Sequence, residues 1–273
     1  SKTLLFELLT KINNQNSSGE FYLTDIVEHA VLAGKSCKVV QCNELETMGV
    51  NSRAELSKAE LEYQNRRRDA ALKNGVTMPA PLTVHFSYDT NIGCDTIIEQ
   101  NVVFGPGVTV ETGSQIKAFS HLEGAFVASG AIVGPYARLR PGTQLERNVK
   151  IGNFVEVKES RIATGAKVNH LSYIGNASVG ARANIGAGTI TCNFDGVMKH
   201  QTKIGTDAFI GSNTMLVAPV SIGKEALTAS GSVIVNDVPN GALALGRSKQ
   251  VNKPGLAIKL LAKFRSLKAT KKE

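Results

Sequence analysis

The sequence of 273 residues contains no tryptophan, only four cysteines and 5% aromatic residues. The cysteines, at positions 37, 42, 94 and 192, form no CxxC pair, which excludes a dense disulfide framework and indicates a reducing, cytoplasmic environment. No apolar run approaches the ~18 residues that a membrane-spanning helix needs, and no charged leader precedes an apolar stretch. We therefore expect a soluble protein without a membrane span.

Basic residues exceed acidic ones by 31 to 23, but the excess lies at one end of the chain. Nine Lys and Arg residues between positions 247 and 272 face a single acid, whereas the first 246 residues carry 22 basic and 22 acidic residues. A nucleic-acid-binding protein spreads a basic face over its folded body. The charge distribution therefore argues against nucleic acid as a partner.

The first 75 residues have an ordinary mixed composition. Apolar spacing predicts helices at about 3–12 and 25–33 and a short strand at 37–40, which together form a small α/β segment over 1–50. Ser52 and Glu55 have capping-box spacing and predict a linker helix over 51–75. We interpret Arg66, Arg67 and Arg68 on this helix as a solvated face. The chain starts at Ser1 and enters an apolar run at once, so we expect it to be part of a longer polypeptide.

From Ile92 onward, an aliphatic residue recurs every six positions, with occasional five-residue steps. Such a period is typical of a parallel β-helix, in which three hexapeptides form a triangular coil of about 18 residues. We expect roughly seven coils in a domain over 76–240, followed by a basic arm over 241–273. Ile204 follows Ile185 by 19 positions, which exceeds one or two steps, so residues 191–199 should form an outlying loop, and such loops often carry function.

Residues one coil apart become neighbours at the ~4.8 Å spacing of adjacent strands. Arg140 and Lys158 are 18 residues apart and should therefore project side by side. At an effective dielectric of ~20 their repulsion amounts to about 3 kcal/mol, unless a bound phosphate lies between them or the side chains splay into solvent. In the same register, Glu156 should stack beside Tyr173.

His170 should stand between Asn153 and Ala187 and point outward, because Val168 takes the inward position. An outward histidine is either inert or a general base, since its pKa of ~6.5 suits proton transfer at neutral pH. We expect the imidazole and the two cations to share one edge of the prism. The other histidines lack ligand spacing, so no metal site is expected there. Cys192 is an alternative acyl carrier, although no base is evident beside it.

Four contiguous strings give a more specific signal: residues 134–142 (GPYARLRPG), 152–158 (GNFVEVK), 170–173 (HLSY) and 184–193 (NIGAGTITCN). They closely resemble the bacterial bifunctional N-acetylglucosamine-1-phosphate uridyltransferase / glucosamine-1-phosphate N-acetyltransferase family. The resemblance implies a mainly β fold, a left-handed parallel β-helix with a small α/β remnant and a linking helix at its N-terminus. It also implies a cytoplasmic homotrimer with sites between subunits.

The implied activity is transfer of an acetyl group from acetyl-CoA to the amine of glucosamine 1-phosphate, in the synthesis of UDP-N-acetylglucosamine for peptidoglycan and lipopolysaccharide. In that family the residue matching His170 is the general base. We add the inference that Glu156 orients the amine or His170. The resemblance assigns the sugar phosphate to Arg140, Lys158 and Tyr173, the sugar to Asn184, and acetyl-CoA to Ala187, Asn193, Phe194, Ser212 and Arg247, with Ser230 and Lys199 as further candidates.

Two positions depart from the family pattern, since Phe194 stands where Tyr is frequent and Ser230 replaces Ala. Residues 1–75 look like the end of the uridyltransferase domain and its linking helix. Asn51 matches a ligand of Mg²⁺, which only that half would use, but the glycine-rich nucleotide loop is absent from the chain. We therefore expect no uridyltransferase activity, so UTP should give no pyrophosphate release above background.

Two rival interpretations and one open question remain. A non-catalytic β-helix would show flat ladders of Thr or Ser and no outlying loop, and another hexapeptide acyltransferase would take a different acceptor. In the basic arm, Leu256, Leu260, Phe264 and Leu267 recur at helical spacing. This stripe either lies on a membrane surface or packs on a neighbouring subunit near the phosphates of CoA.

Overall fold

The computed structural model describes residues 1–270 and divides into two compact units, one over Ser1–Glu60 and one that begins at Leu61. The first unit contains α1 (Lys2–Leu9), α2 (Asp25–Leu32), a 3₁₀ turn η1 (Glu44–Glu46) and the start of α3 (Arg53–Lys73). The two helices expected there are confirmed, although α1 ends three residues earlier than predicted. They pack against each other around a small core of Leu8 and Ala30.

The strand expected at 37–40 is wrong. Val39 and Val40 are 93% and 85% exposed and lie in irregular backbone. A β-strand needs a neighbouring strand to satisfy its backbone groups, and the described residues of the first unit contain none. The local preference of valine for strands is therefore not enough to form one here.

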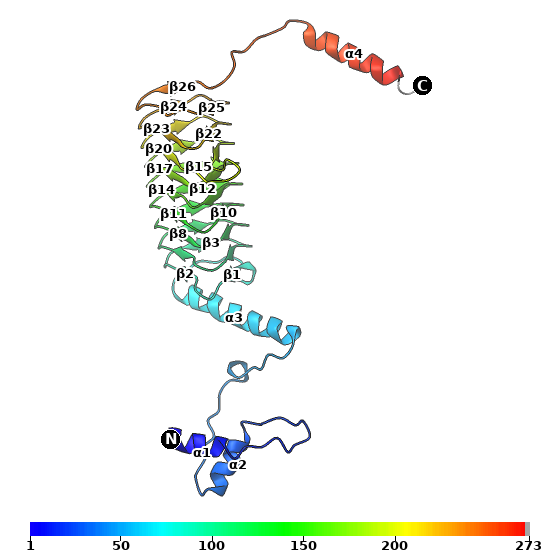
Figure 1. Cartoon of the computed structure of the whole chain (residues 1–273). Coiled ribbons are helices and arrows are strands. Elements are labelled where there is room, and N and C mark those ends of the chain that lie inside the picture. The colour runs from blue at the N-terminus through cyan, green and yellow to red at the C-terminus, as the bar shows by residue number, and fades with distance from the viewer. Residues whose placement is uncertain (271–273) are drawn as a thin grey trace. The chain divides into compact units, whose positions relative to one another are not determined.

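The second unit is a left-handed parallel β-helix built from three sheets (Figure 1). We call them sheet 1, sheet 2 and sheet 3 in the order in which the chain enters them. Sheet 1 contains β1 (His85–Phe86), β4 (Val103–Phe104), β7 (His121–Leu122), β10 (Arg138–Leu139), β13 (Glu156–Lys158), β16 (Tyr173–Gly175), β19 (Ile190–Cys192), β22 (Met215–Val217) and β25 (Val233–Ile234).

Sheet 2 contains β2 (Asn91–Ile92), β5 (Thr109–Val110), β8 (Ala125–Val127), β11 (Thr143–Leu145), β14 (Arg161–Ile162), β17 (Ala177–Val179), β20 (Thr202–Ile204) and β23 (Val220–Ile222). Sheet 3 contains β3 (Ile97–Ile98), β6 (Gln115–Ile116), β9 (Ile132–Val133), β12 (Lys150–Asn153), β15 (Lys167–His170), β18 (Asn184–Ile185), β21 (Phe209–Ile210), β24 (Leu227–Thr228) and β26 (Leu243–Ala244). The 3₁₀ turn η2 (Pro81–Thr83) precedes β1, and α4 (Leu256–Thr270) follows β26.

The hexapeptide period is confirmed as the source of the core. Along sheet 3, for example, Ile151, Val168 and Ile185 stack directly on one another and are at most 2% exposed. The β-helix has about nine coils rather than the predicted seven, since it starts at β1 and ends at β26. The additional coils lie at the two ends, where Phe86 and Ala244 rather than Ile, Leu or Val fill the inward position.

Helix α3 closes the N-terminal end of the β-helix core. The Gln64 side chain accepts a hydrogen bond from the Phe86 backbone N–H (2.9 Å) and donates one to the Phe86 carbonyl (2.7 Å). Arg68 is 7% exposed and donates from Nε to the Val84 carbonyl (2.9 Å), and Arg67 donates to the Thr90 carbonyl. These side chains satisfy backbone groups at the edges of the first coil that would otherwise need water.

The interpretation of the arginine triplet as a solvated face is therefore wrong for two of its three members. Only Arg66 faces solvent, where it pairs with Glu62 across one helical turn (2.7 Å). The reason is that the edge of the first coil exposes backbone carbonyls, which a long guanidinium side chain can reach while its stem stays on apolar surface.

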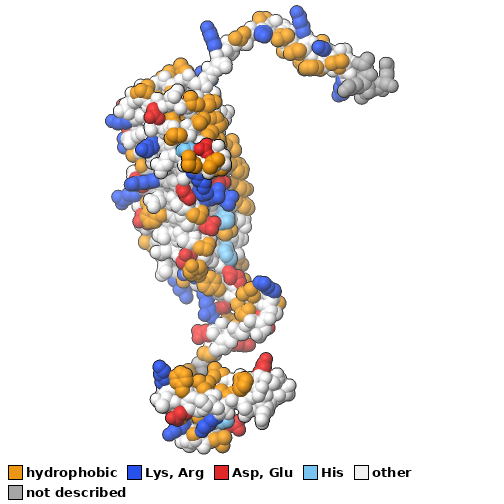
Figure 2. All heavy atoms as spheres, in the orientation of Figure 1, with side chains coloured by type: hydrophobic (Ala, Val, Ile, Leu, Met, Phe, Trp, Pro, Cys, Tyr) orange, Lys and Arg blue, Asp and Glu red, His pale blue; other side chains and the backbone are white. Residues whose placement is uncertain are grey.

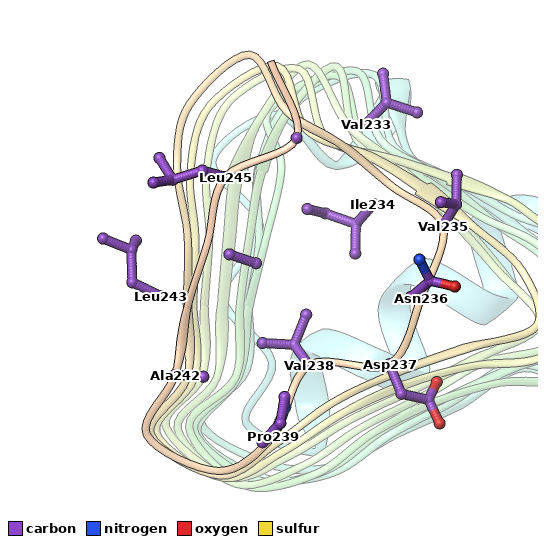
Figure 3. Close-up of a pocket in the computed structure, with 12 residues that line it drawn as sticks. Val233, Ile234, Val235, Asn236, Asp237, Val238, Pro239, Ala242, Leu243 and Leu245 are labelled. Carbon is purple, nitrogen blue, oxygen red and sulfur yellow. The ribbon is translucent and has the colours of Figure 1, made fainter. Parts of the chain in front are cut away.

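The C-terminal end of the β-helix is open in the described chain. A cavity of about 340 Å³ lies in the last coil, and the side chains of Ile234 and Val238 point into it (Figure 3). Helix α4 follows after a connecting segment, and its apolar residues Leu260, Leu261 and Phe264 are 43–58% exposed. No helix within the described residues is both long and apolar enough to cross a bilayer.

The cap on the N-terminal end can be tested with Gln64→Ala. This change leaves the buried N–H and C=O of Phe86 without partners, which costs about 1–3 kcal/mol for each group. We expect a clear fall in the melting temperature of the β-helix unit, measured by circular dichroism. The control Arg66→Ala removes an exposed ion pair on the same helix and should cost less than about 1 kcal/mol. Equal melting temperatures for the two variants would contradict the assignment of Gln64 as a cap.

Candidate active site

Four of the expected site residues lie on the outer face of sheet 1, on three successive coils. Glu156 is in register with Tyr173, and the Arg140 backbone N–H donates to the carbonyl of Val157, which sets Arg140 beside Lys158. Both predicted neighbour pairs are thus confirmed. The Tyr173 ring lies over Gly175, where an added Cβ would come within 2.5 Å of the phenol oxygen. Glycine at 175 therefore makes room for the tyrosine on this face.

The Glu156 carboxylate is held by arginine. Nη1 of Arg140 donates to Oε1 of Glu156 at 2.7 Å, and Nη1 of Arg138 lies 4.0 Å from Oε2. The hydrogen bond to Glu156 raises the pKa of Arg140 above its ordinary value. This geometry fixes the Arg140 guanidinium on the sheet 1 face. The same contact pairs the Glu156 carboxylate with a cation, although we expected this group to orient either the amine or His170.

Three cations gather at the end of sheet 1 that leads into sheet 2, and we call Arg140, Lys158 and Lys199 the cation cluster. Lys199 comes from the 193–200 loop and lies close enough to Lys158 to lower its pKa, and the charge of Arg140 acts in the same direction. Figure 2 shows Lys and Arg side chains gathered on this part of the β-helix, with histidine close by. An anion placed among the three would relieve their mutual repulsion.

His170 lies at the end of β15, exposed and turned outward as predicted. Its Nδ1 lies 2.6 Å from Oδ1 of Asn153, the residue in register with it on β12. Because an amide oxygen only accepts, Nδ1 carries the proton and Nε2 keeps a free lone pair. Asn153 rather than Glu156 therefore orients the imidazole, a role that sequence reasoning missed although it had placed the two residues side by side.

The expectation that imidazole and cations share one edge is wrong. His170 ends a strand of sheet 3, at the corner before sheet 1, whereas Lys158 ends a strand of sheet 1, at the corner after it. Both border the same face from opposite sides. The repeat gives the register of residues along the β-helix axis. It does not give the distance between the two corners, which are separated by the width of sheet 1.

Several residues expected to bind acetyl-CoA continue the coil position of His170. The registers of β15 with β18, β18 with β21 and β21 with β24 carry this position through Ala187 and Ser212 to Ser230. We call the series Asn153, His170, Ala187, Ser212 and Ser230 the His170 column. At its end, Nη1 of Arg247 donates to the carbonyl of Ser230 (2.9 Å).

The 193–200 loop leaves sheet 1 after β19, and the chain rejoins the β-helix at β20 of sheet 2, as the long interval predicted. Asn193 is 7% exposed and donates from Nδ2 to Oδ1 of Asn176 (2.7 Å), which anchors the loop on the preceding coil. Phe194 is 58% exposed and pairs with Lys199 in an antiparallel bridge. The loop therefore brings Lys199 to the cation cluster, and the structure does not place it on the His170 column.

An exposed apolar ridge borders the same face at the corner between sheet 3 and sheet 1. It consists of Phe119, Tyr136, Phe154 and Leu171, which occupy equivalent corner positions with φ between 52° and 61°. The three rings stack at centroid distances of 4.8 and 5.3 Å. Between this ridge and Glu156 and Tyr173 lies an open depression of about 430 Å³. A sugar-sized ligand fits a hollow with one apolar and one polar wall.

Asn184 and Asn51 lie apart from this face, whereas Cys192 ends β19 of sheet 1 itself. Asn184 is on sheet 3, in register with Lys167 and Phe209. Burial raises the pKa of the Cys192 thiol, which disfavours the thiolate that an acyl carrier needs. Asn51 belongs to the first unit, where its backbone N–H donates to Glu55 (2.6 Å).

Asn51 does not form a magnesium site with its neighbours. Mg²⁺ demands near-octahedral oxygen ligands, usually including one or two carboxylates. Within residues 1–270 no group of three or more His, Cys, Asp or Glu side chains gathers as it would around a metal ion. The residues present therefore do not fit the metal, and no step of the chemistry below uses it.

The fold and the repeat define a hexapeptide-repeat β-helix protein, and residues 201–235 match the family model described as a hexapeptide repeat of succinyl-transferase. The chain is also 63% identical to the bifunctional protein GlmU of Jannaschia sp. (strain CCS1) and 61% identical to that of Roseobacter denitrificans, each over 98% of its length. The chain is thus similar to GlmU proteins over nearly all of its own length, and it spans about 59% of the length of these relatives.

Among solved structures, LpxA from Bacteroides fragilis, a UDP-N-acetylglucosamine acyltransferase, is 18% identical to this chain. The match covers 60% of this chain and 70% of that chain, with a TM-score of 0.42.

The cation cluster predicts an anion site that can be tested without turnover. Inorganic phosphate at about a hundred times its Kd should stabilise the folded protein by ~2.7 kcal/mol, seen as a rise in melting temperature. Lys158→Met and Lys199→Met should each reduce this rise. Arg182→Met, which removes a cation paired with Asp207 at a different corner, should leave it unchanged. A rise that survives both lysine substitutions would place phosphate elsewhere.

Proposed function

We propose that this chain is a glucosamine-1-phosphate N-acetyltransferase that uses acetyl-CoA as the acetyl donor. The observation that carries the proposal is one face of the β-helix with an oriented imidazole at one border and a cation cluster at the other. An amino sugar with a phosphate on its anomeric carbon has the matching layout, a nucleophilic amine at one end and a dianion at the other. The sequence identity to GlmU proteins supports the same activity.

The sugar phosphate is assigned to the face of sheet 1. The phosphate accepts from Arg140, Lys158 and Lys199, with the Tyr173 hydroxyl beside it, and this pairing offsets the repulsion that lowers the pKa of Lys158. The sugar ring occupies the depression, and its amine points toward His170. Lys199 thus moves from the acetyl-CoA residues, where the family resemblance had placed it as a candidate, to the phosphate residues.

His170 acts as the general base. Nε2 takes a proton from the amine while the amine nitrogen attacks the thioester carbonyl, which forms the C–N bond and a tetrahedral oxyanion. A backbone N–H near Asn193 or Ala187 stabilises the oxyanion. The C–S bond then breaks, and the imidazolium returns its proton to the departing CoA thiolate. Asn153 holds the tautomer with Nε2 free throughout, and no acyl-enzyme is needed.

Acetyl-CoA is assigned to the His170 column. The thioester lies at Ala187, one coil from the base, and the CoA moiety extends past Ser212 and Ser230 toward Arg247, whose guanidinium suits its phosphates. The main chain at Ser230 already bonds to Arg247, so the change from Ala to Ser there leaves backbone contacts available. Phe194 and Asn193 lie in the loop at the opposite corner of sheet 1, so they would border the acetyl group only from a neighbouring subunit, where Phe194 offers an apolar surface without a hydroxyl.

The proposed assembly is a homotrimer with each site between subunits. The exposed apolar ridge next to His170 supports this, because contiguous apolar surface of this kind marks protein contacts. The position of Asn184 also supports a site between subunits. It lies on sheet 3 rather than on the sheet of the cation cluster, so Asn184 of a second copy would be the one to reach the sugar. Helix α4 with its basic, apolar-striped surface is then assigned to a neighbouring subunit near CoA, rather than to a membrane surface.

The proposed setting is the cytoplasmic synthesis of UDP-N-acetylglucosamine for peptidoglycan and lipopolysaccharide. The four cysteines are all free thiols in the structure, as expected for a reducing compartment. We retain the domain division proposed from the sequence. It consists of a uridyltransferase remnant over 1–50, a linker helix over 51–75, the β-helix over 76–240 and an arm over 241–273. Mg²⁺ would belong to the uridyltransferase half alone.

The activity is tested by release of the CoA thiol with and without glucosamine 1-phosphate. His170→Ala should lower kcat by about 10²–10⁴, whereas acetyl-CoA binding measured by calorimetry should persist. The control His121→Ala changes an exposed histidine on a different sheet, on β7 of sheet 1, and should leave turnover intact. Near-normal turnover of His170→Ala would refute the base assignment, and release that ignores the sugar phosphate would point to a different acceptor or a non-catalytic β-helix.

The trimer is tested at the apolar ridge. Phe154→Arg places a charge in the middle of the stacked rings, so we expect light scattering to show a loss of trimer in favour of monomer. Phe126→Arg, on sheet 2, changes another exposed phenylalanine that lies away from the ridge and should preserve the trimer. If the Phe154 variant keeps its mass while the Phe126 variant dissociates, the interface lies on sheet 2 instead.

A further inference from the structure

The 193–200 loop is closed by an internal pair of side chains that the proposed chemistry does not use. Nε2 of His200 lies 2.7 Å from Oδ2 of Asp195, and the other carboxylate oxygen accepts from the backbone N–H of Val197 (2.8 Å) and Met198 (2.7 Å). The His200 bond, followed by the two backbone bonds, holds the pKa of Asp195 well below its usual range. Both oxygens of one carboxylate thus bind the loop to itself.

Asp195 and His200 lie on either side of Lys199 in the sequence, and Lys199 is the loop residue that belongs to the cation cluster. The backbone N–H of His200 donates to the Asn193 carbonyl (2.8 Å), and the Asp195 N–H donates to the Met198 carbonyl (3.2 Å). Lys199 therefore sits between a closed turn on one side and the His200 bond on the other. The start of the loop is anchored on the preceding coil through Asn193 and Asn176, and the chain is tied to that coil again at Thr202, two residues after the loop.

An exposed loop would not otherwise keep a lysine against two other cations. Val197 and Met198 at the loop tip are 87% and 60% exposed and contribute little packing. Coulomb repulsion from Lys158 and Arg140 acts to move Lys199 away from the site. The loop must be held in this conformation before an anion arrives. The side-chain bonds of Asp195 and His200 do so together with the backbone bridge between Phe194 and Lys199.

We propose that Asp195 and His200 form a latch that positions Lys199 for the phosphate of the sugar substrate. Both are positioning residues, since they act through the loop and not on the reacting atoms. The proposal rests on the function proposed above. It specifies which of the two substrates depends on the loop conformation, because the latch fixes Lys199 at the cation cluster and leaves the His170 column untouched.

The test is steady-state kinetics of His200→Ala with each substrate varied in turn. We expect KM for glucosamine 1-phosphate to rise about tenfold, the effect of losing roughly one charge-assisted hydrogen bond. KM for acetyl-CoA and kcat should change less than about twofold. His200→Asn keeps an N–H donor within reach of Asp195 and should restore most of the affinity. A merely structural role would lower stability without this selective change in KM or this rescue.

A matched control uses an ion pair at another corner of the β-helix. Asp207→Ala breaks the bidentate pair with Arg182 (2.6 and 2.8 Å) at the corner between sheets 2 and 3. This variant should leave both KM values unchanged. If His200→Ala changes neither KM, or raises KM for acetyl-CoA as much as that for the sugar phosphate, the latch proposal is overturned.

Amide hydrogen exchange separates this proposal from the proposed function. In His200→Ala, the amides of Val197 and Met198 should exchange faster than in the parent protein, whether or not the protein turns over. Unchanged exchange would show that the pair does not hold the loop. Faster exchange combined with a parent protein that does not acetylate glucosamine 1-phosphate would refute the proposed function, and the substrate-positioning role would fall with it.

Discussion

Everything on the functional face depends on the parallel register that stacks one coil on the next. Parallel strands fix neighbours at about 4.8 Å, and the two-residue alternation within each strand fixes which side chains point outward. Val157 and Ile174 fill the interior, so Glu156 and Tyr173 must meet outside. The hydrophobic core thereby determines the chemistry of the surface. A register shift of one residue would bury the charged groups and expose the core.

The sequence was most informative where this register decides the outcome. The repeat predicted the β-helix, the outward position of His170 and the neighbours Arg140 and Lys158, because each follows from counting residues along the core. The ends of the β-helix were less predictable. Arg67 and Arg68 resemble surface residues in the sequence, because the free backbone groups at the edge of the first coil are not apparent there. The strand predicted at 37–40 does not form because no neighbouring strand within the described residues pairs with it.

Side-chain pairing was the least predictable part of the site. Counting placed Asn153 next to His170, but only the geometry shows that its oxygen fixes the imidazole tautomer. Likewise, Glu156 was expected near the amine or the base, while the structure ties it to Arg140. The family resemblance made Lys199 a candidate for binding acetyl-CoA. The repeat could not place this residue, because loop residues have no register with the coils. Its position depends on bonds within the loop, which no periodicity reveals.

The stacking also limits how this protein can vary. Where coils pass closest, a side chain has no room: at Gly152, an added Cβ would overlap the backbone of Asn169 on the next coil. Insertions are therefore tolerated only as loops at corners or as complete turns. The separation between His170 and Arg247, and with it the length of donor molecule that can lie along the column, can change only in whole steps of ~4.8 Å. The β-helix can therefore match the length of the proposed donor only in steps of one coil.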